Sequence, residues 1–348
     1  MAPWLLVGNP TARSGRAAER IEAALAGMAE RGLETDFVST LPAGETVELV
    51  ARAIDAGGVE TVVCLGGDGT FADVAKGVLS ATRRVRMGML PSGTANDQGQ
   101  SFGISSMRSA LPENLDLLQA GYTIPLDVGE ILALDERDQP IHRDWFFDSA
   151  GFGMSPAILF TRNRNREWVA RLPVIRNVYR DQLVYAGAWA QEMLRSYVEP
   201  VKFTAEVRWA GGTSILPNLT DLVINNTALY GGLWVPARLG EPDDGEMELV
   251  PLHGRRDMIT KAVRDLKDLP IWQEQLDLLG LPNPEGFSAA WFDILLLHPE
   301  GRDIPAQLDG EEWHAGQHFR IDVLARRLPL IVRGGWTPPW KPRRPPHD

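Results

Sequence analysis

The sequence predicts an α/β domain built on a parallel sheet, followed by a mostly antiparallel β domain with helical insertions. In residues 4–122, short apolar runs alternate with longer amphipathic runs, which is the pattern of parallel βαβ units. Beyond residue 122, strand-like runs follow one another without helices between them. A length of 348 residues is enough for two domains that each bury a core.

The first domain is expected to contain four strands and three helices. The strands are predicted at 4–8, 35–39, 59–65 and 86–90, and the helices at 16–31, 44–56 and from 69 to 79. In such sheets ligands bind beyond the carboxyl ends of the strands. The loops 9–15, 66–70 and 91–97 follow three of these strands, so we expect all three to face one crevice.

The second domain is expected to be rich in strands. Strands are predicted at 124–131, 144–150, 201–209, 220–226, 247–251 and 291–297, and helical segments at 155–198 and 256–280. The last residues, 334–348, are rich in proline and arginine and predict an extended tail. No internal repeat is present.

Composition excludes several classes of protein. The formal net charge of −11 argues against nonspecific binding to nucleic acid. The only cysteine, Cys64, lies in an apolar strand, so neither a disulfide framework nor a zinc cluster is expected. No run is long enough for a spanning helix or a signal peptide. We therefore expect a cytoplasmic protein whose contact with a membrane, at the inner face, is peripheral.

The segment Gly66-Gly67-Asp68-Gly69-Thr70 lies between a strand and a helix. Glycines there let the backbone approach a ligand, and the helix start offers N–H groups to phosphate. Asp68 would repel phosphate unless a divalent cation bridges the two. The segment therefore predicts a phosphate site with a metal, and the alternative is an ordinary strand-to-helix turn with an exposed aspartate.

Two further loops carry polar residues of the same kind. Gly93-Thr94 repeats the small residue and hydroxyl, and Asn96 is placed to bridge the loops or to cap the next helix. Asn9, followed by Pro10, stands with Arg13 and Arg16 after the first strand. These side chains are candidates for contact with ribose or phosphate, and the alternative is a solvated helix start.

Two acidic turns lie late in the chain. Asp309 and Glu311 form a carboxylate pair, and Glu311 suits the base that accepts a hydroxyl proton in phosphoryl transfer. Asp244 lies in a second acidic turn whose oxygens suit Mg²⁺. Both turns are equally typical of hairpins without a catalytic role. The six histidines are scattered and show no ligand spacing.

Together these motifs resemble the diacylglycerol kinase catalytic-domain family of lipid kinases, which includes bacterial diacylglycerol and phosphatidylglycerol kinases, sphingosine kinases and ceramide kinases. The marks of that family, in chain order, are Asn9-Pro10 with Ser14-Gly15, Gly66–Thr70, Pro91–Asp97 and Asp309-Gly310-Glu311. The ordered match runs from about residue 4 to 332.

The resemblance implies a nucleotide domain like that of NAD kinases and 6-phosphofructokinases, at residues 1–122, and a β-sandwich acceptor domain at 123–319. It also implies that about 320–333 returns to the first domain. By the same resemblance, ATP is held by Asn9, Pro10, Arg13, Thr40, Gly66, Gly67, Asp68, Gly69, Thr70, Gly93, Thr94 and Asn96. Asp68 and Asp244 would act with Mg²⁺, and Glu311, Asp309 and Asp68 would be catalytic.

The chain departs from the family pattern at two places. Gln98-Gly99 stands where an aromatic and a basic residue are frequent, which leaves the acceptor contacts open. Ser155 replaces an acidic residue found near amino-bearing lipids, which weakens the case for a sphingoid acceptor. The segment 255–295 looks long for a compact bacterial member and has no assigned role beyond lining or covering the acceptor site.

The function predicted is that of an ATP- and Mg²⁺-dependent kinase acting on a primary hydroxyl of diacylglycerol or a similar lipid. An NAD kinase or other small-alcohol kinase, a sphingosine or ceramide kinase, and a nucleotide-binding regulator without turnover are the alternatives, and a homodimer is left open. Six arginines of the helical insertion, Arg162, Arg164, Arg166, Arg171, Arg176 and Arg180, are candidates for contact with anionic lipid.

Overall fold

The computed structural model describes residues 2–12, 16–93, 95–157, 159–160, 202–229, 240–253 and 286–339. The chain divides into two compact units. Unit 1 consists of Met1–Val128, Asn226–Glu246 and Leu324–Asp348, and unit 2 of Gly129–Asn225 and Met247–Val323.

Unit 1 is built on a parallel sheet. Its strands are β1 (Trp4–Gly8), β2 (Thr35–Ser39), β3 (Thr61–Gly66) and β4 (Arg86–Pro91), and they pair in the order β2-β1-β3-β4. The core strands β3 and β4 are buried almost throughout, as parallel strands covered on both faces are. Their carboxyl ends therefore lie along one edge.

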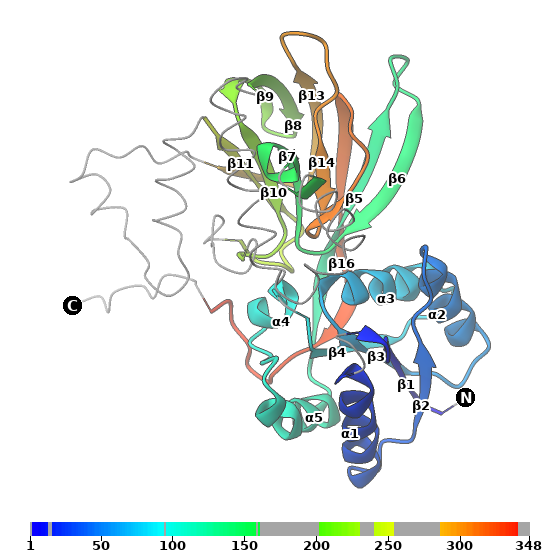
Figure 1. The fold of residues 1–348 in the computed structure, drawn as a ribbon. Helices are drawn as coiled ribbons and strands as arrows, with labels where there is room; N and C mark the ends of the chain where they lie inside the picture. Colours follow the sequence, from blue (N-terminus) through cyan, green and yellow to red (C-terminus); the bar gives the residue numbers. More distant parts are fainter. Residues whose placement is uncertain are drawn as a thin grey trace, which may run out of the picture. The chain divides into compact units, whose positions relative to one another are not determined.

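Helices cover both faces of this sheet (Figure 1). They are α1 (Arg16–Glu30), α2 (Glu45–Asp55), α3 (Asp68–Ser80), the short α4 (Asp97–Ser101) and α5 (Leu111–Ala120). The helix α2 packs against α3, and α1 packs against α5. The apolar side of α1 has helical spacing, with Ala17, Ile21, Ala24 and Met28 buried.

Two long strands pass from one unit to the other. The strand β5 (Thr123–Leu134) leaves unit 1, and β16 (His318–Ile331) returns to it. Within unit 1, Leu330 of β16 pairs in parallel with Met87 of β4. The parallel sheet of unit 1 thus gains a strand from the far end of the chain.

Unit 2 contains two antiparallel sheets. One is six-stranded, in the order β12-β11-β10-β7-β14-β15. The other is the antiparallel part, β16-β13-β8-β9 with β5 and β6, of a ten-stranded sheet that also contains β2-β1-β3-β4. The bounds of the strands not given above are β6 Pro140–Phe146, β7 Ser149–Gly153, β8 Phe203–Trp209, β9 Gly212–Leu219, β10 Asp221–Asn225, β11 Met247–Leu252, β12 Phe287–Ala289, β13 Trp291–Leu297, β14 Ala306–Leu308 and β15 Glu311–Glu312.

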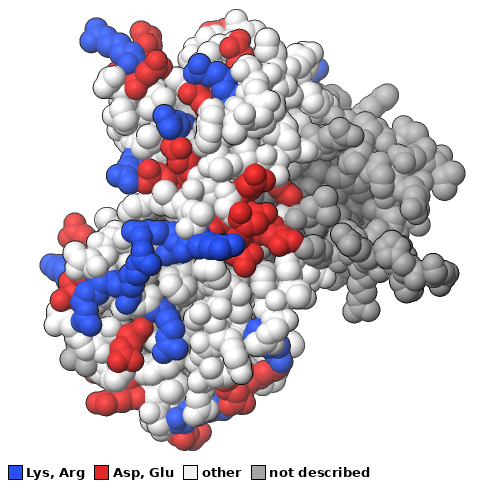
Figure 2. Space-filling model, turned by 180° about the vertical axis from the view of Figure 1, so that it is seen from behind, with Lys and Arg blue, Asp and Glu red and all other residues white. Residues whose placement is uncertain are grey.

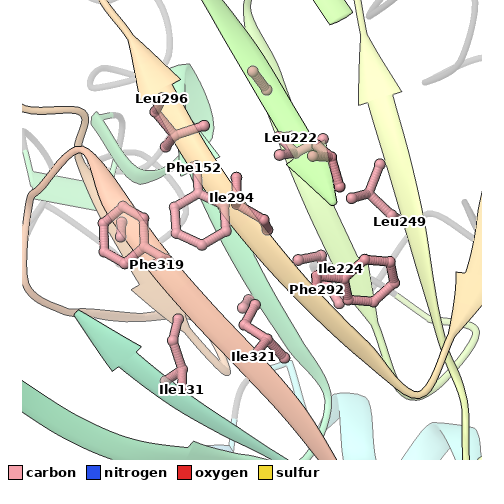
Figure 3. Packing of buried hydrophobic residues seen from close by; sticks show 14 of the residues in the cluster. Ile131, Phe152, Leu222, Ile224, Leu249, Phe292, Ile294, Leu296, Phe319 and Ile321 are labelled. Carbon is pink, nitrogen blue, oxygen red and sulfur yellow. The ribbon is translucent and has the colours of Figure 1, made fainter. Parts of the chain in front are cut away.

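The core of unit 2 is formed by the inner faces of both sheets (Figure 3). Along β13, Phe292, Ile294 and Leu296 are fully buried while the residues between them are more exposed, which is the alternation of a strand with one face inward. Phe152 of β7 and Phe319 of β16 meet with ring centroids 4.8 Å apart. The predicted fold class, α/β followed by antiparallel β, is confirmed.

One predicted strand was wrong. The segment 144–150 was expected to be a single strand, but β6 ends at Phe146 and β7 begins at Ser149. The break is where the chain leaves one sheet and enters the other, since β6 pairs with β5 and β7 pairs with β10 and β14. At this break the N–H groups of Phe147, Asp148 and Ser149 donate to the carboxylate of Asp309. The six arginines lie outside the described ranges, as does the helical segment predicted at 256–280 and, apart from residues 155–157 and 159–160, the one predicted at 155–198.

Charge is mixed over the surface. On the face shown in Figure 2, a band of Lys and Arg side chains meets a group of Asp and Glu side chains, so neither sign covers it. No helix among the described residues is long and apolar enough to cross a membrane.

Candidate nucleotide and phosphoryl-transfer residues

The two glycine loops of unit 1 follow adjacent parallel strands. Gly66 at the end of β3 pairs in register with Pro91 at the end of β4. The N–H of Ser92 then donates to the carbonyl oxygen of Gly66 at 2.6 Å. The strand ladder is thereby extended beyond the last strand residues, and both loops start side by side.

The same two loops touch backbone to backbone. A Cβ atom on Gly93 would lie 2.5 Å from the Cα of Gly67, and one on Gly67 would lie 3.0 Å from the Cα of Gly93. A Cβ on Gly66 would meet the side chain of Thr70 at 2.4 Å. Glycine is required at these positions because the two backbones approach too closely for a side chain to fit between them. The loop backbone is therefore accessible, as a phosphate cradle needs.

Asn96 shapes the second loop from within. Its Oδ1 accepts from the N–H of Gly93 at 2.6 Å, and its Nδ2 donates to the carbonyl oxygen of Gly93 at 2.9 Å. The residue is buried and has a φ of 54°, in the left-handed region where asparagine is tolerated. It precedes α4 without a side-chain cap to that helix, so the capping alternative is wrong.

Asp68 joins the two loops through its side chain. As the first residue of α3, it accepts from the N–H of Gln98 in α4, with 3.2 Å between Oδ1 and N. Burial raises the pKa of the Asp68 carboxyl, while the N–H groups of Gln98, Asp97 and Asn96 act in the opposite direction. A carboxylate held half-buried at the mouth of a glycine cradle is the type of ligand that a divalent cation prefers.

The other predicted nucleotide residues lie at the same edge of the sheet. Thr11 donates to Oδ1 of Asn9 from its N–H at 3.0 Å and from its hydroxyl at 2.8 Å, immediately after β1. Thr40 follows β2 and its N–H donates to the carbonyl oxygen of Gly8 at 3.0 Å. Pro10 lies in the turn between Asn9 and Thr11. Arg13 and Thr94 lie outside the described residues.

Sequence reasoning missed two residues at this edge. Arg20 of α1 donates through Nη2 to the carbonyl oxygens of Pro91 at 2.7 Å and Ser106 at 2.9 Å, so it fixes the start of the second loop. Gln98 is 3% exposed, and neither polar atom of its side chain has a partner in the described part of the chain. The only sequence signal was the departure from the family pattern at Gln98, and nothing singled out Arg20.

The acidic turn around Asp244 is organised by Asp127 of β5. The carboxylate of Asp127 accepts from the N–H of Gly245 at 2.6 Å and from the N–H of Arg326 at 2.5 Å. Asp244 itself accepts from the N–H of Glu246 at 2.9 Å. Burial and then the neighbouring carboxylates raise the pKa of Asp244. Among the described residues, no group of three or more His, Cys, Asp or Glu is arranged to hold a metal.

In unit 2, Glu311 is presented by a tight hairpin. The strands β14 and β15 pair Leu308 with Glu311, and the two loop residues Asp309 and Gly310 have φ values of 49° and 80°. Two successive positive φ angles are those of a type I′ turn, for which Asp-Gly is a preferred sequence. The side chain of Glu311 is exposed, whereas the carboxylate of Asp309 accepts from three backbone N–H groups.

Comparison with known proteins finds a family model and several relatives that are similar to this chain. Residues 3–131 match the model of the diacylglycerol kinase catalytic domain. The chain is similar to a Mycobacterium tuberculosis protein named diacylglycerol kinase, with 26% identity over 256 residues that span 74% of each chain. A probable lipid kinase YegS-like of Pseudomonas putida is 34% identical over 110 residues, which is 30% of this chain and 37% of that one.

The fold has a solved counterpart. The crystal structure of a diacylglycerol kinase from Bacillus anthracis superposes with a TM-score of 0.68 and 16% identity, covering 96% of this chain and 98% of that chain. At this identity the similarity concerns the fold alone. The resemblance that the motifs indicate is confirmed, since residues 3–131 match the model of the diacylglycerol kinase catalytic domain and the relatives are named diacylglycerol kinase and YegS-like lipid kinase.

Proposed function

We propose that the chain is an ATP- and Mg²⁺-dependent lipid kinase that transfers the γ-phosphoryl group to a primary hydroxyl of diacylglycerol or a similar lipid. The observation that carries the proposal is the close contact of Gly67 with Gly93, with Asp68 beside it, inside a segment that matches a diacylglycerol kinase catalytic domain. The names of the relatives, diacylglycerol kinase and YegS-like lipid kinase, support a lipid as acceptor.

Unit 1 supplies the nucleotide side of this reaction. The bare backbone of the two loops and the start of α3 fit the phosphates, since a helix start favours negative charge. Asp68 would hold Mg²⁺, because this ion is usually bound by one or two carboxylates together with substrate phosphates and waters. The magnesium ion would supply charge neutralisation at the transferred group. Asp244 stays a candidate for a second site.

Unit 2 supplies the base. Glu311 would accept the proton of the acceptor hydroxyl as its oxygen bonds to the γ-phosphorus, while the bond from that phosphorus to the β–γ bridging oxygen breaks and ADP leaves. Phosphoryl transfer depends mainly on positioning and charge stabilisation, so one well-placed carboxylate is sufficient for the proton.

Two alternatives are weighed by specific features. An NAD kinase shares Gly66–Thr70, but the Pro91–Asp97 form of the second loop and the names of the relatives favour a lipid acceptor. A regulator without turnover has no need for Asp68 and Glu311 together. The proposed membrane contact through Arg162–Arg180 falls on residues outside the described ranges, and vesicle binding at low and high salt would test it.

The test is incubation of the purified chain with labelled ATP and Mg²⁺ and separate acceptors, namely diacylglycerol, monoacylglycerol, phosphatidylglycerol, sphingosine, ceramide and NAD. Mass spectrometry of the products identifies the phosphorylated species. We expect phosphate on a glycerolipid hydroxyl, and only when Mg²⁺ is present. Phosphate on NAD alone, or bound ATP without transfer to any acceptor, would refute the proposal.

A further inference from the structure

The carboxylate of Asp309 accepts hydrogen bonds from three successive backbone N–H groups. Its Oδ1 lies 3.1 Å from the N of Phe147, 2.7 Å from the N of Asp148 and 3.1 Å from the N of Ser149, and its Oδ2 lies 3.0 Å from the N of Phe147. In return, the N–H of Asp309 donates to the carbonyl oxygen of Ser149 at 2.9 Å. One side chain thus binds all three backbone N–H groups from the break between β6 and β7 to the first residue of β7.

The turn that carries Asp309 is held on its other side as well. Oε1 of Gln307 accepts from the N–H of Gly310 at 2.6 Å, and Gln307 is only 1% exposed. The strand β14 pairs with β7 through Gln307 and Gly151 and through Leu308 and Ala150. Backbone pairing and two side chains therefore fix the turn against buried structure.

Glu311 is two residues beyond Asp309 and lies in β15, which pairs with β14 at the end of the described sheet order. The position of Glu311 is set by the Asp309–Gly310 turn. A displacement of this turn by 1 Å would carry Glu311 with it, and misplacement of that size typically costs about 10²-fold in rate.

We propose that Asp309 is a positioning residue that orients Glu311 by binding the backbone of Phe147–Ser149, and that it is not itself an acid, base or metal ligand. This inference rests on the proposed function for the role of Glu311. It revises the sequence-based prediction that Asp309 is catalytic, since its carboxylate is directed at three backbone N–H groups of the break between β6 and β7.

The test compares Asp309→Asn with Asp309→Ala, using Glu311→Gln as the reference for a lost base. Asn keeps an Oδ1 within reach of the same three N–H groups and loses only the second contact of Phe147, which goes to Oδ2, whereas Ala leaves all three without this acceptor. We expect kcat of the Asn variant within a few-fold of wild type. In the Ala variant we expect a fall of about 10²-fold, with the KM for ATP little changed because the nucleotide loops belong to unit 1.

A matched control is Glu312→Gln, which removes an exposed carboxylate of the same hairpin and is expected to leave kcat within a few-fold of wild type. A second measurement needs no activity. Hydrogen–deuterium exchange of the peptide spanning 147–149 should be faster in the Ala variant and unchanged in the Asn variant. Circular dichroism and thermal denaturation establish that each variant is folded.

Each result decides the inference. A loss in Asp309→Asn as large as in Glu311→Gln would overturn it, because the backbone bonds are kept but the charge is lost. Unchanged exchange at 147–149 in a folded Asp309→Ala protein would overturn it as well. If wild type phosphorylates no lipid, the proposed function fails, and the exchange measurement alone then decides whether Asp309 holds the break.

Discussion

Substitution of Gly93 by alanine should separate the two nucleotide loops without unfolding the domain. The added Cβ would lie 2.5 Å from the Cα of Gly67, and ordinary contact begins at 3.4 Å, so the two backbones must move apart by about 0.9 Å. Little slack is present, because the N–H of Ser92 already donates to Gly66 at 2.6 Å. Overpacking of this kind costs about 1–3 kcal/mol of unfolding free energy.

The functional effect should exceed the effect on stability. If phosphate is bound by the backbone of both loops, a shift of this size misaligns the N–H groups, and we expect Mg²⁺–ATP affinity to fall by at least about tenfold, which equals about 1.4 kcal/mol. Titration calorimetry with a nonhydrolysable ATP analogue measures the affinity, and urea denaturation measures the stability.

Gly103→Ala is the matched control in unit 1. Gly103 has a φ of 69° and no atom within 4 Å of the added Cβ, so alanine there costs about 1–2 kcal/mol of backbone strain without a clash. It should lower stability by a similar amount and leave ATP affinity unchanged. The reasoning is refuted if Gly93→Ala binds the analogue as wild type does, or if Gly103→Ala loses the same affinity.

Three further predictions concern titration and catalysis. Burial raises the pKa of Asp221 to about 7, above the value of an unfolded chain, so the folded state binds the proton more tightly and stability should fall as pH rises from about 4 to 7. Asp221→Asn, whose Oδ1 can still accept from the N–H of Ser155, should flatten this decline and raise the free energy of unfolding at pH 8 by up to about 4 kcal/mol. Urea denaturation at several pH values measures this, and an unchanged dependence of stability on pH would contradict the prediction. Glu311→Gln should lower kcat by about 10²–10⁴-fold while ATP still binds in calorimetry, and near-normal turnover would remove Glu311 from the base role. Asp68→Asn should weaken Mg²⁺-dependent ATP use more than folding, and wild-type rates across a Mg²⁺ titration would show that Asp68 has no part in metal or phosphate binding.

Much of unit 1 could be predicted because its signals are local. Alternating apolar and amphipathic runs predicted β1 to β4 and α1 to α3 to within a few residues, and glycines marked the loops that follow β3 and β4. The rule that parallel strands place their carboxyl ends at one edge then brings Asn9, Thr40, Asp68 and Gly93 to that edge. The nucleotide-binding role of these residues stays a prediction, as do the domain bounds.

Short or irregular elements gave weaker signals. The helices α4 and α5 and the strands β9, β14 and β15 were not predicted. The helix α4 has five residues, and β14 and β15 have three and two, which is too few to show a period. The single strand predicted at 144–150 was wrong for a different reason. The residues of β6 and β7 favour extended structure throughout, but β6 pairs in one sheet and β7 in the other, and local sequence does not mark that change of sheet. The N–H of Asp148 at the break is bound by Asp309, 161 positions away.

The tertiary structure decided what depends on partners far apart in the sequence. Asp127 meets the N–H of Arg326 across 199 positions, and the last strand, β16, returns to pair with β4. Local sequence carries no record of such pairs, because a carboxylate that will bind backbone N–H groups looks the same as one that will bind solvent or substrate. The sequence by itself determined that Asp309 and Glu311 stand together on an Asp-Gly turn. Only the fold showed that the first carboxylate binds the backbone N–H groups of Phe147–Ser149 while the second is exposed.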